Sequence, residues 1–237
     1  MSTYWAVVPA RGGSKGISNK NMRLVCGRPL FWHSVNAAIA CKKVNRVILT
    51  TDDAEIIESC CKLFKDDVDI VRRPPELATD EAPTEPCIVH AVKKVAEVSR
   101  EPLPDFVILL QPTSPYRGEG LLRRCIYELE SNDADSLLTV GDCPINLWKS
   151  ENGNASPMQD MTERPRRQDV KMCDRRYFEN GSVYITRTSI LMETMNRIGG
   201  KTRLMPTSRA ESVDVDSIED LTLIRGFMTE VYDAYSL

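Results

Sequence analysis

Short β-branched segments alternate with longer helical patterns from Tyr4 to Val140, and this alternation limits the fold more than any other feature of the chain. Strands are expected at Tyr4–Val8, Arg46–Thr51, Val68–Val71, Phe106–Leu110 and Ser136–Val140. The segments between them predict helices near Pro29–Cys41, Ala54–Phe64, Glu85–Ser99 and Glu119–Glu130. Such alternation is typical of an α/β fold with three layers, in which helices flank a mostly parallel sheet. Ligands of these folds bind beyond the carboxyl ends of the strands.

Between residues 141 and 180 the alternation stops and a polar segment takes its place. This segment contains Asn152-Gly153-Asn154 and the basic cluster Arg164-Pro165-Arg166-Arg167. A long stretch without periodicity inside a compact domain is functional, disordered or an interaction arm. We interpret residues 141–180 as an arm that returns to the sheet at Ser182–Thr186.

The last part of the chain predicts a helix near Ile190–Arg197, a short strand near Arg203–Pro206 and a final helix from about Ser217. Ser217 is a natural N-cap, and Asp220 follows three residues later. The 237 residues, 42% of them hydrophobic, are enough to bury one sizeable core. We therefore expect a single domain over residues 1–237, with the arm as its one excursion.

Composition argues against several classes of function. The chain has 31 basic and 34 acidic residues, a formal net charge of -3, so neither nucleic acid nor a membrane surface is an expected partner. No segment approaches the ~20 apolar residues of a membrane span, and no basic leader precedes the apolar start, so we expect a cytoplasmic protein. The 8 cysteines lack a CxxC pair and are expected to be reduced. Because only His33 and His90 are present, chemistry must come from carboxylates, cations and backbone.

A glycine-rich segment, Pro9-Ala10-Arg11-Gly12-Gly13-Ser14-Lys15-Gly16, follows the first expected strand, and Lys20-Asn21 comes shortly after. Glycines let the backbone approach a ligand closely, and Arg11, Lys15 and Lys20 add charges that suit a triphosphate. The pattern is neither a P-loop nor the dinucleotide-binding Rossmann fingerprint. Most glycine-rich loops are flexible turns, but the position at a strand's carboxyl end favours a phosphate site.

Asp214-Val215-Asp216 is the second candidate constellation. Alternation along an extended segment points both carboxylates to the same side, which suits Mg²⁺ completed by phosphate oxygens and water. On spacing alone, exposed aspartates before a helix cap are an equal alternative. The cationic glycine loop favours the metal, because nucleotide phosphates need a metal partner.

Two further polar loops, Arg73–Asp80 and Gln111–Arg117, each follow an expected strand, and their prolines would hold polar side chains over the sheet edge. The basic cluster that ends at Arg167-Gln168 has two interpretations. It is either a solvated face, the usual role of a charge run, or a clamp for a sugar carboxylate.

Together these segments resemble the acylneuraminate cytidylyltransferases (CMP-sialic acid synthetases). The resemblance covers nearly the whole chain and rests on ordered motifs: the glycine loop with Lys20-Asn21; Arg73-Pro74 with Glu76-Leu77-Ala78 and Asp80; Leu110-Gln111-Pro112-Thr113-Ser114-Pro115 with Arg117; Arg167-Gln168; Asn180-Gly181-Ser182-Val183-Tyr184-Ile185; and Asp214-Val215-Asp216 with Glu219-Asp220-Leu221. It implies the Rossmann-like fold of the nucleotide-diphospho-sugar transferases.

The resemblance also implies roles for residues. CTP would be held by Ala10, Arg11, Gly12, Gly13, Ser14, Lys15, Lys20, Asn21, Arg73, Asp80, Ala82 and Thr84. The sugar acid would contact Gln111, Lys149, Arg167, Gln168 and Asn180, and Mg²⁺ would bind Asp214 and Asp216. Arg11, Lys15, Lys20 and Asp216 would be catalytic. By the same resemblance, the 141–180 arm would reach a partner in a homodimer and help form its site.

The implied reaction transfers CMP from CTP to the anomeric hydroxyl of a nonulosonic acid by in-line attack, with release of pyrophosphate. Ser18, Tyr116 and Arg175-Arg176 depart from the common family pattern, and relatives with the same signature use legionaminic or pseudaminic acid. The resemblance therefore indicates a class of sugar. Two alternatives stay open: a cytidylyltransferase for another acidic sugar, such as 3-deoxy-manno-octulosonate, and a non-catalytic nucleotide-binding module on the same fold.

Overall fold

The computed structural model describes residues 2–13, 16–143, 147–158, 169–170 and 175–235. Within these residues the main sheet has seven strands in the order β11-β7-β10-β6-β1-β4-β5. Only β10 runs antiparallel to its neighbours in the printed pairings, so the prediction of a mostly parallel sheet is confirmed. The strand bounds are β1 Tyr4–Pro9, β4 Arg46–Thr51, β5 Asp69–Arg72, β6 Phe106–Leu109, β7 Ser136–Asp142, β10 Tyr177–Arg187 and β11 Thr202–Pro206.

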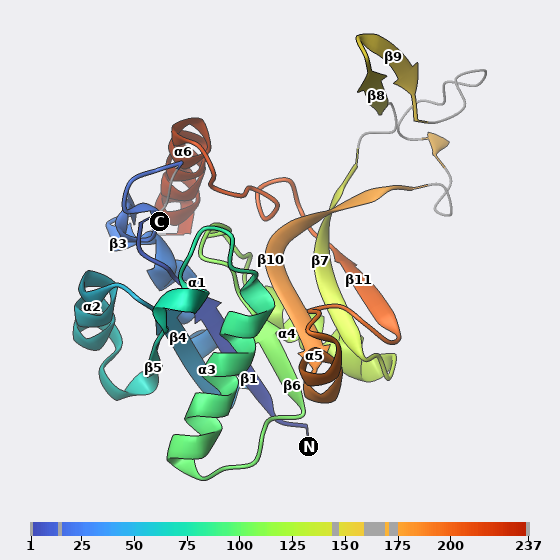
Figure 1. The fold of residues 1–237 in the computed structure, drawn as a ribbon. Helices are drawn as coiled ribbons and strands as arrows, with labels where there is room; N and C mark the ends of the chain where they lie inside the picture. The colour runs from blue at the N-terminus through green and yellow to red at the C-terminus, as the bar shows by residue number, and fades with distance from the viewer. Residues whose placement is uncertain (1, 14–15, 144–146, 159–168, 171–174, 236–237) are drawn as a thin grey trace.

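Helices cover both faces of this sheet, as Figure 1 shows. On one face α1 (Leu30–Ala40), α2 (Ala54–Phe64) and α4 (Leu121–Ser131) pack against alternate strand residues such as Ala6 and Val8. On the other face α3 (Thr84–Ser99) and α5 (Thr188–Thr194) pack against the intervening residues, Trp5 and Val7 among them. Because side chains alternate along a strand, one apolar strand serves both cores. The expected three-layer α/β fold is confirmed.

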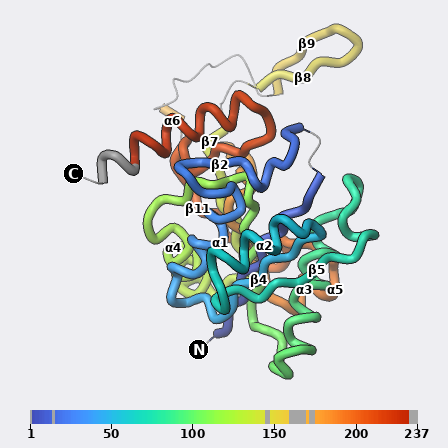
Figure 2. Tube along the Cα trace, turned by 90° about the vertical axis from the view of Figure 1, so that its left-hand side faces the viewer, coloured from blue at the N-terminus to red at the C-terminus, as the bar shows by residue number. Residues whose placement is uncertain are grey.

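A smaller core joins the final helix to the start of the chain. The helix α6 (Ile218–Tyr235) packs beside the short strand β2 (Leu24–Val25), which pairs with β3 (Arg28–Pro29), as Figure 2 shows. Its core residues come from distant parts of the sequence: Ile17, Val25, Leu30, Val215, Leu221, Ile224 and Met228. This packing brings the aspartate segment to the glycine loop.

The predicted cap of α6 is present. The Ser217 hydroxyl donates to Asp220 Oδ2 at 2.7 Å, and the Asp220 amide donates back to Ser217 Oγ at 3.1 Å. The Ser217 amide also donates to Asp220 Oδ2 at 2.8 Å, so the cap satisfies two amides at the start of the helix, those of Ser217 and Asp220.

Some elements differ from the expectation. The chain returns to the sheet at Tyr177, earlier than the expected Ser182, and β10 extends to Arg187. The helix α5 ends at Thr194, before the expected Arg197, because Met195 has a left-handed backbone conformation. Within the arm, β8 (Trp148–Glu151) and β9 (Asn154–Pro157) form a hairpin that was not predicted, although an Asn-Gly pair is a known hairpin signal. Short 3-10 turns at Lys20–Met22, Lys65–Asp67 and Pro75–Leu77 were also not predicted.

Two further expectations concern membrane-spanning segments and the state of the cysteines. Among the described residues, no helix combines the length and hydropathy that crossing a bilayer requires. The described cysteines are free thiols, several of them buried, and Cys173 lies outside the described residues.

Candidate functional site

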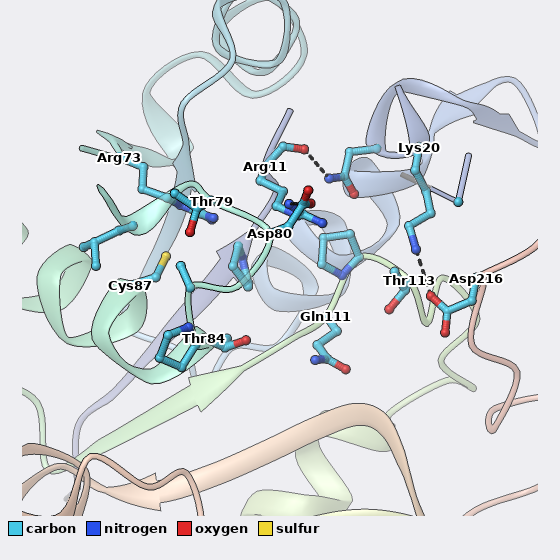
Figure 3. A pocket seen from close by; sticks show the side chains of 17 residues that line it. Arg11, Lys20, Arg73, Thr79, Asp80, Thr84, Cys87, Gln111, Thr113 and Asp216 are labelled. Atoms are coloured by element: carbon cyan, nitrogen blue, oxygen red, sulfur yellow. Dashed lines mark hydrogen bonds and ion pairs between the residues drawn. The ribbon is translucent and has the colours of Figure 1, made fainter. Parts of the chain in front are cut away.

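A cavity of about 390 Å³ lies at the carboxyl ends of the central strands. Pro9 at the end of β1, Arg73 just after β5 and Gln111 just after β6 all line it. Figure 3 shows how the labelled side chains converge on this space from separate loops. This is the edge at which ligands of parallel α/β sheets bind.

The glycine loop forms one wall of the cavity. The Asn21 side chain donates to the Arg11 carbonyl oxygen at 2.8 Å, and the Arg11 guanidinium forms an ion pair with Asp80 across the cavity. A Cβ atom on Gly16 would lie 2.7 Å from the Asp216 carbonyl oxygen, so only glycine allows this approach. Ser14 and Lys15 lie outside the described residues.

Two aspartates behind the loop were not predicted as site residues. The Gly12 amide donates to Asp52 Oδ1 at 3.0 Å, and a Cβ atom on Gly12 would lie 2.7 Å from Asp53 Oδ2. Asp53 also caps α2, where it accepts from the amides of Glu55 and Ile56. Both aspartates directly follow the β4 strand, and that position was the available signal. Asp52 therefore holds Gly12 against the sheet, and the Ala10 amide is held separately by the Thr50 carbonyl oxygen at 3.0 Å.

Lys20, from the first part of the chain, contacts the aspartate segment from its last part. Its ammonium donates to the Val215 carbonyl oxygen and to Asp216 Oδ1, both at 2.9 Å. The Val215 amide donates to the Thr113 carbonyl oxygen at 2.7 Å, and the Val215 side chain is fully buried. The aspartate segment is therefore fixed at its central residue, with Asp216 at the cavity and Asp214 half-buried behind it.

The donor set of this segment fits a hard divalent cation. Asp214 Oδ1 is buried and has no hydrogen-bond partner among the described residues. Burial raises the pKa of Asp214, and a hydrogen bond from Thr113 acts in the opposite direction. The described residues contain no group of three or more His, Cys, Asp or Glu side chains placed to hold a metal ion. A pair of carboxylates is nevertheless sufficient for Mg²⁺ when substrate phosphates and water complete its shell.

The opposite wall is built from the segment after β5 and the start of α3. Arg73 is 7% exposed and donates through Nη2 to the Thr50 carbonyl oxygen at 3.0 Å, while its Nε has no partner among the described residues. Predicted residues Asp80, Ala82 and Thr84 line this wall. The structure adds Leu77, Thr79, Pro83 and Cys87 to it. An unpartnered donor on a buried cation suits an oxygen acceptor of a bound ligand.

The predicted sugar contacts are only partly brought together. Gln111 lines the cavity, and its side-chain oxygen lies against Gly181 so closely that a Cβ atom there would collide with it. Asn180 is 3% exposed, and its amide is engaged by Thr139, Thr207 and Ser212. It is a buried support beneath Gly181 and does not line the cavity.

The remaining predicted sugar contacts lie on the arm. Lys149 is an exposed residue of β8, and its Nζ lies 3.6 Å from Glu151 Oε1. The hairpin that contains it projects away from the sheet in Figure 1. Arg167 and Gln168 lie outside the described residues. Within the described chain, no arm side chain lines the cavity.

The family model described as "Cytidylyltransferase" matches residues 5–196. The chain is 27% identical to the N-acylneuraminate cytidylyltransferase of Streptococcus agalactiae serotype III (strain NEM316), over 94% of this chain and 52% of that protein. It is 29% identical to the CMP-N,N'-diacetyllegionaminic acid synthase of Legionella pneumophila, over 94% of this chain and 95% of that protein. The chain thus spans about half the length of the streptococcal relatives.

Solved structures agree on the fold. A CMP:2-keto-3-deoxy-manno-octonic acid synthetase complexed with CTP superposes with a TM-score of 0.66, at 16% identity, over 97% of this chain and 99% of that chain. A 4-diphosphocytidyl-2C-methyl-D-erythritol synthase gives a TM-score of 0.69 at 11% identity, over 96% and 100% of the two chains.

Proposed function

This chain belongs to the cytidylyltransferase family, and we propose that it transfers CMP from CTP to the anomeric hydroxyl of a nonulosonic, sialic-acid-like sugar acid, with release of pyrophosphate. The observation that carries the proposal is the cavity at the carboxyl edge of the sheet. Three cationic side chains and one carboxylate line it together: Arg11, Lys20, Arg73 and Asp216. The names of the Streptococcus and Legionella relatives support the class of sugar. A reducing cytoplasmic location accords with the free thiols of the described cysteines.

The nucleotide would lie between the glycine loop and the wall after β5. Arg73 offers its free Nε to an oxygen of the nucleotide, and Ala82 and Thr84 form the adjoining surface. Arg11 and Lys20, together with Lys15 and Ser14 of the same loop, would neutralise the phosphates. In this arrangement, binding requires that phosphate oxygens replace Asp80 as the partner of Arg11.

Asp214 and Asp216 would hold Mg²⁺. The support is the buried, unpartnered Asp214 Oδ1 beside an aspartate that lines the cavity. When bound, the ion supplies positive charge that neutralises the phosphates and polarises the reacting phosphorus centre. Lys20 keeps Asp216 in place through its ion pair at 2.9 Å.

The protein's part in the reaction is alignment and charge neutralisation. The anomeric hydroxyl would lose its proton to solvent as its oxygen forms a bond to the α-phosphorus. The bond from that phosphorus to the bridging oxygen breaks, and pyrophosphate leaves with the electron pair. Gln111 would orient the sugar acid at the mouth of the cavity. Lys20 and Arg11 would stabilise the negative charge that develops on the leaving pyrophosphate.

A homodimer would complete the sugar site. The strands of the β8–β9 hairpin are almost entirely exposed, and an isolated two-stranded hairpin is only marginally stable in water. We propose that this hairpin packs on a second copy of the chain. Lys149, Arg167 and Gln168 would then reach the sugar acid in the partner's cavity, since within one chain Lys149 does not line the cavity.

Pyrophosphate release tests the function. The chain is incubated with Mg²⁺, each of the four nucleoside triphosphates and a panel of sugar acids. We expect release only with CTP and a nonulosonic acid, and Asp216→Ala should reduce the rate by about 10² to 10³. Preference for 3-deoxy-manno-octulosonate would contradict the sugar class. Binding of CTP without release under any condition would instead support a non-catalytic module.

A further inference from the structure

Arg117 is a partly buried arginine that lies behind the cavity. Arg117 Nη1 donates to the Ser34 hydroxyl at 2.9 Å, and Nη2 donates to the carbonyl oxygens of Gln111 at 3.0 Å and Ser182 at 2.7 Å. Ser34 in turn donates to the same Gln111 carbonyl at 3.0 Å. The guanidinium therefore joins α1, the segment after β6 and the β10 strand at one point.

The segment held by Arg117 connects two walls of the cavity. At its start, the Gln111 side chain lines the cavity and abuts Gly181 of β10. Near its end, the Thr113 carbonyl oxygen receives the Val215 amide at 2.7 Å, which anchors the aspartate segment. Figure 3 shows Gln111 and Thr113 on this segment, with Thr113 toward Asp216. A shift of the segment would thus move the Gln111 amide and the aspartates together.

The partners of Arg117 are neutral. Within the described part of the chain, no carboxylate forms an ion pair with it, whereas Arg11, Arg124 and Arg197 each pair with one. Burial lowers the pKa of Arg117 to about 9, so it remains a cation at neutral pH. Even partial burial of an unpaired cation costs free energy. The planar guanidinium reaches the Ser34 hydroxyl through Nη1 and the two carbonyl oxygens through Nη2, a fixed spacing of donors that a lysine ammonium does not provide.

We infer that Arg117 is a positioning residue, which fixes the Gln111–Ser114 turn and thereby sets the distance between the sugar-binding wall and the aspartate pair. The inference rests on the proposed function. The nucleotide wall, with Arg73 and Thr84, is attached to β5 and α3, and among the described residues the hydrogen-bond partners of Arg117 are Ser34, Gln111 and Ser182, none of which belongs to that wall. Loss of the Arg117 guanidinium should therefore weaken binding of the sugar acid and of Mg²⁺ and leave binding of CTP unchanged.

Arg117→Lys tests this selectivity, because lysine keeps the charge and loses the planar guanidinium. We expect the KM for the sugar acid and the Mg²⁺ concentration for half-maximal rate to rise about tenfold each, as for other groups that orient ligands indirectly. The Kd of CTP, measured in EDTA by calorimetry, should be unchanged. Ser34→Ala should shift the same two quantities in the same direction by a smaller factor.

Two comparisons make the result decisive. Arg46→Lys is the matched control, since Arg46 also bridges separate segments, Asp69 and Glu101, but lies at the amino end of β4, away from the cavity. It should leave all three quantities unchanged. In a Gln111→Ala background, Arg117→Lys should no longer raise the KM for the sugar acid.

Several outcomes would overturn the inference. Unchanged kinetics of Arg117→Lys, or an additive effect in the Gln111→Ala background, would contradict it directly. A parallel loss of CTP binding would mean that Arg117 supports the fold as a whole. A wild-type chain that releases no pyrophosphate with any sugar acid would contradict the proposed function before any variant is compared.

Discussion

Two cations that line the cavity are paired with carboxylates from distant segments. Arg11 meets Asp80, and Lys20 meets Asp216, across sequence separations of 69 and 196 residues. Both pairs are partly open to solvent, so each contributes little to stability. In the proposed site, phosphate oxygens would replace Asp80 as the partner of Arg11, whereas Lys20 would keep its pair with Asp216.

Asp80→Asn should strengthen the binding of pyrophosphate. The substitution leaves Arg11 without a competing carboxylate at the position where the leaving group would lie. Because a partly exposed ion pair is worth ~0.2–1 kcal/mol, the inhibition constant of pyrophosphate should fall by about 1.4- to fivefold. Product-inhibition kinetics measure this change.

Asp135→Asn is the control for this substitution, since the Asp135–Arg187 pair has similar exposure and lies at the opposite end of the strands. It should not alter product inhibition. Weaker binding of CTP by Asp80→Asn would contradict the account and would indicate that Asp80 holds the nucleotide directly.

His33 should make stability depend on pH. Its Nε2 lies 3.0 Å from the Val25 carbonyl oxygen, and burial lowers its pKa from 6.5 to about 4. The unfolded chain therefore binds a proton at a pH where the folded chain does not. As pH falls from 7 to 5, this residue alone should reduce the free energy of unfolding by about 2 kcal/mol.

Urea unfolding of the wild type and of His33→Gln at pH 7 and pH 5 isolates this effect. Glutamine keeps a donor for the Val25 carbonyl and does not titrate, so the loss of stability should be about 2 kcal/mol smaller in the variant. An equal loss in both proteins would show that His33 is accessible to protons in the folded state.

At the scale of elements, the N-terminal cap of the final helix supports Asp216 of the site. Asp220 of the α6 cap accepts hydrogen bonds from the Ser217 hydroxyl and amide and from the Asp216 amide, at 2.7, 2.8 and 3.1 Å. The cap therefore orients the residue before the helix as well as the helix itself. Hydrogen bonds from Ser217 lower the pKa of Asp220, so this contribution is present at neutral pH and is lost as pH falls below about 4.

Ser217→Ala should cost about 1 kcal/mol of unfolding free energy. It should also raise the Mg²⁺ concentration for half-maximal rate, because Asp216 loses part of its support. Thr222→Ala is the matched control: Thr222 also carries a hydroxyl on α6, bonded to the Ile218 carbonyl, and lies beyond the cap. A change in stability without a change in the Mg²⁺ requirement would contradict the link between cap and site.

Most elements could be predicted from periodicity, because each central strand and its flanking helices bury apolar residues at regular spacing. Val7 and Ala6 serve opposite cores, as alternation requires. The hairpin of the arm escaped prediction because its strands are short and exposed, with no buried face to produce a pattern.

The sequence predicted which residues belong to the site more successfully than it predicted where their side chains point. The motifs indicated Arg11, Lys20, Arg73 and Asp216, all of which line the cavity. Asn180 belongs to the same motif as Gly181, yet its amide is buried against Thr139 and Thr207. The pairing of β10 with β7 shifts register between Glu179 and Tyr184, and side-chain direction there depends on tertiary contacts, which sequence spacing does not contain.

At the scale of the molecule, the arm gives the chain an exposed apolar surface. Trp148 is 53% exposed, Met158 63% and Phe178 42%. Exposed apolar side chains gathered on one projecting segment favour association. We expect the chain to be a dimer in solution, with this surface at the interface.

Trp148→Asp should weaken that dimer, and sedimentation velocity measures the monomer fraction. Tyr127→Asp is the control, because Tyr127 is 70% exposed on α4 and away from the arm. The specific activity of Trp148→Asp should fall with dilution as the dimer dissociates. A wild-type monomer with full activity would contradict both the dimer and a shared sugar site.

The central claim is the transfer of CMP to a sugar acid, and identification of the product tests it most directly. CTP, Mg²⁺ and a nonulosonic acid are incubated with the chain, and the products are examined by phosphorus NMR and mass spectrometry. The account predicts equal amounts of pyrophosphate and of a phosphodiester between CMP and the anomeric carbon of the sugar, with neither product from Asp216→Ala over the same period. Recovery of unchanged CTP with every nonulosonic acid, from a folded wild-type chain that binds CTP, would contradict it.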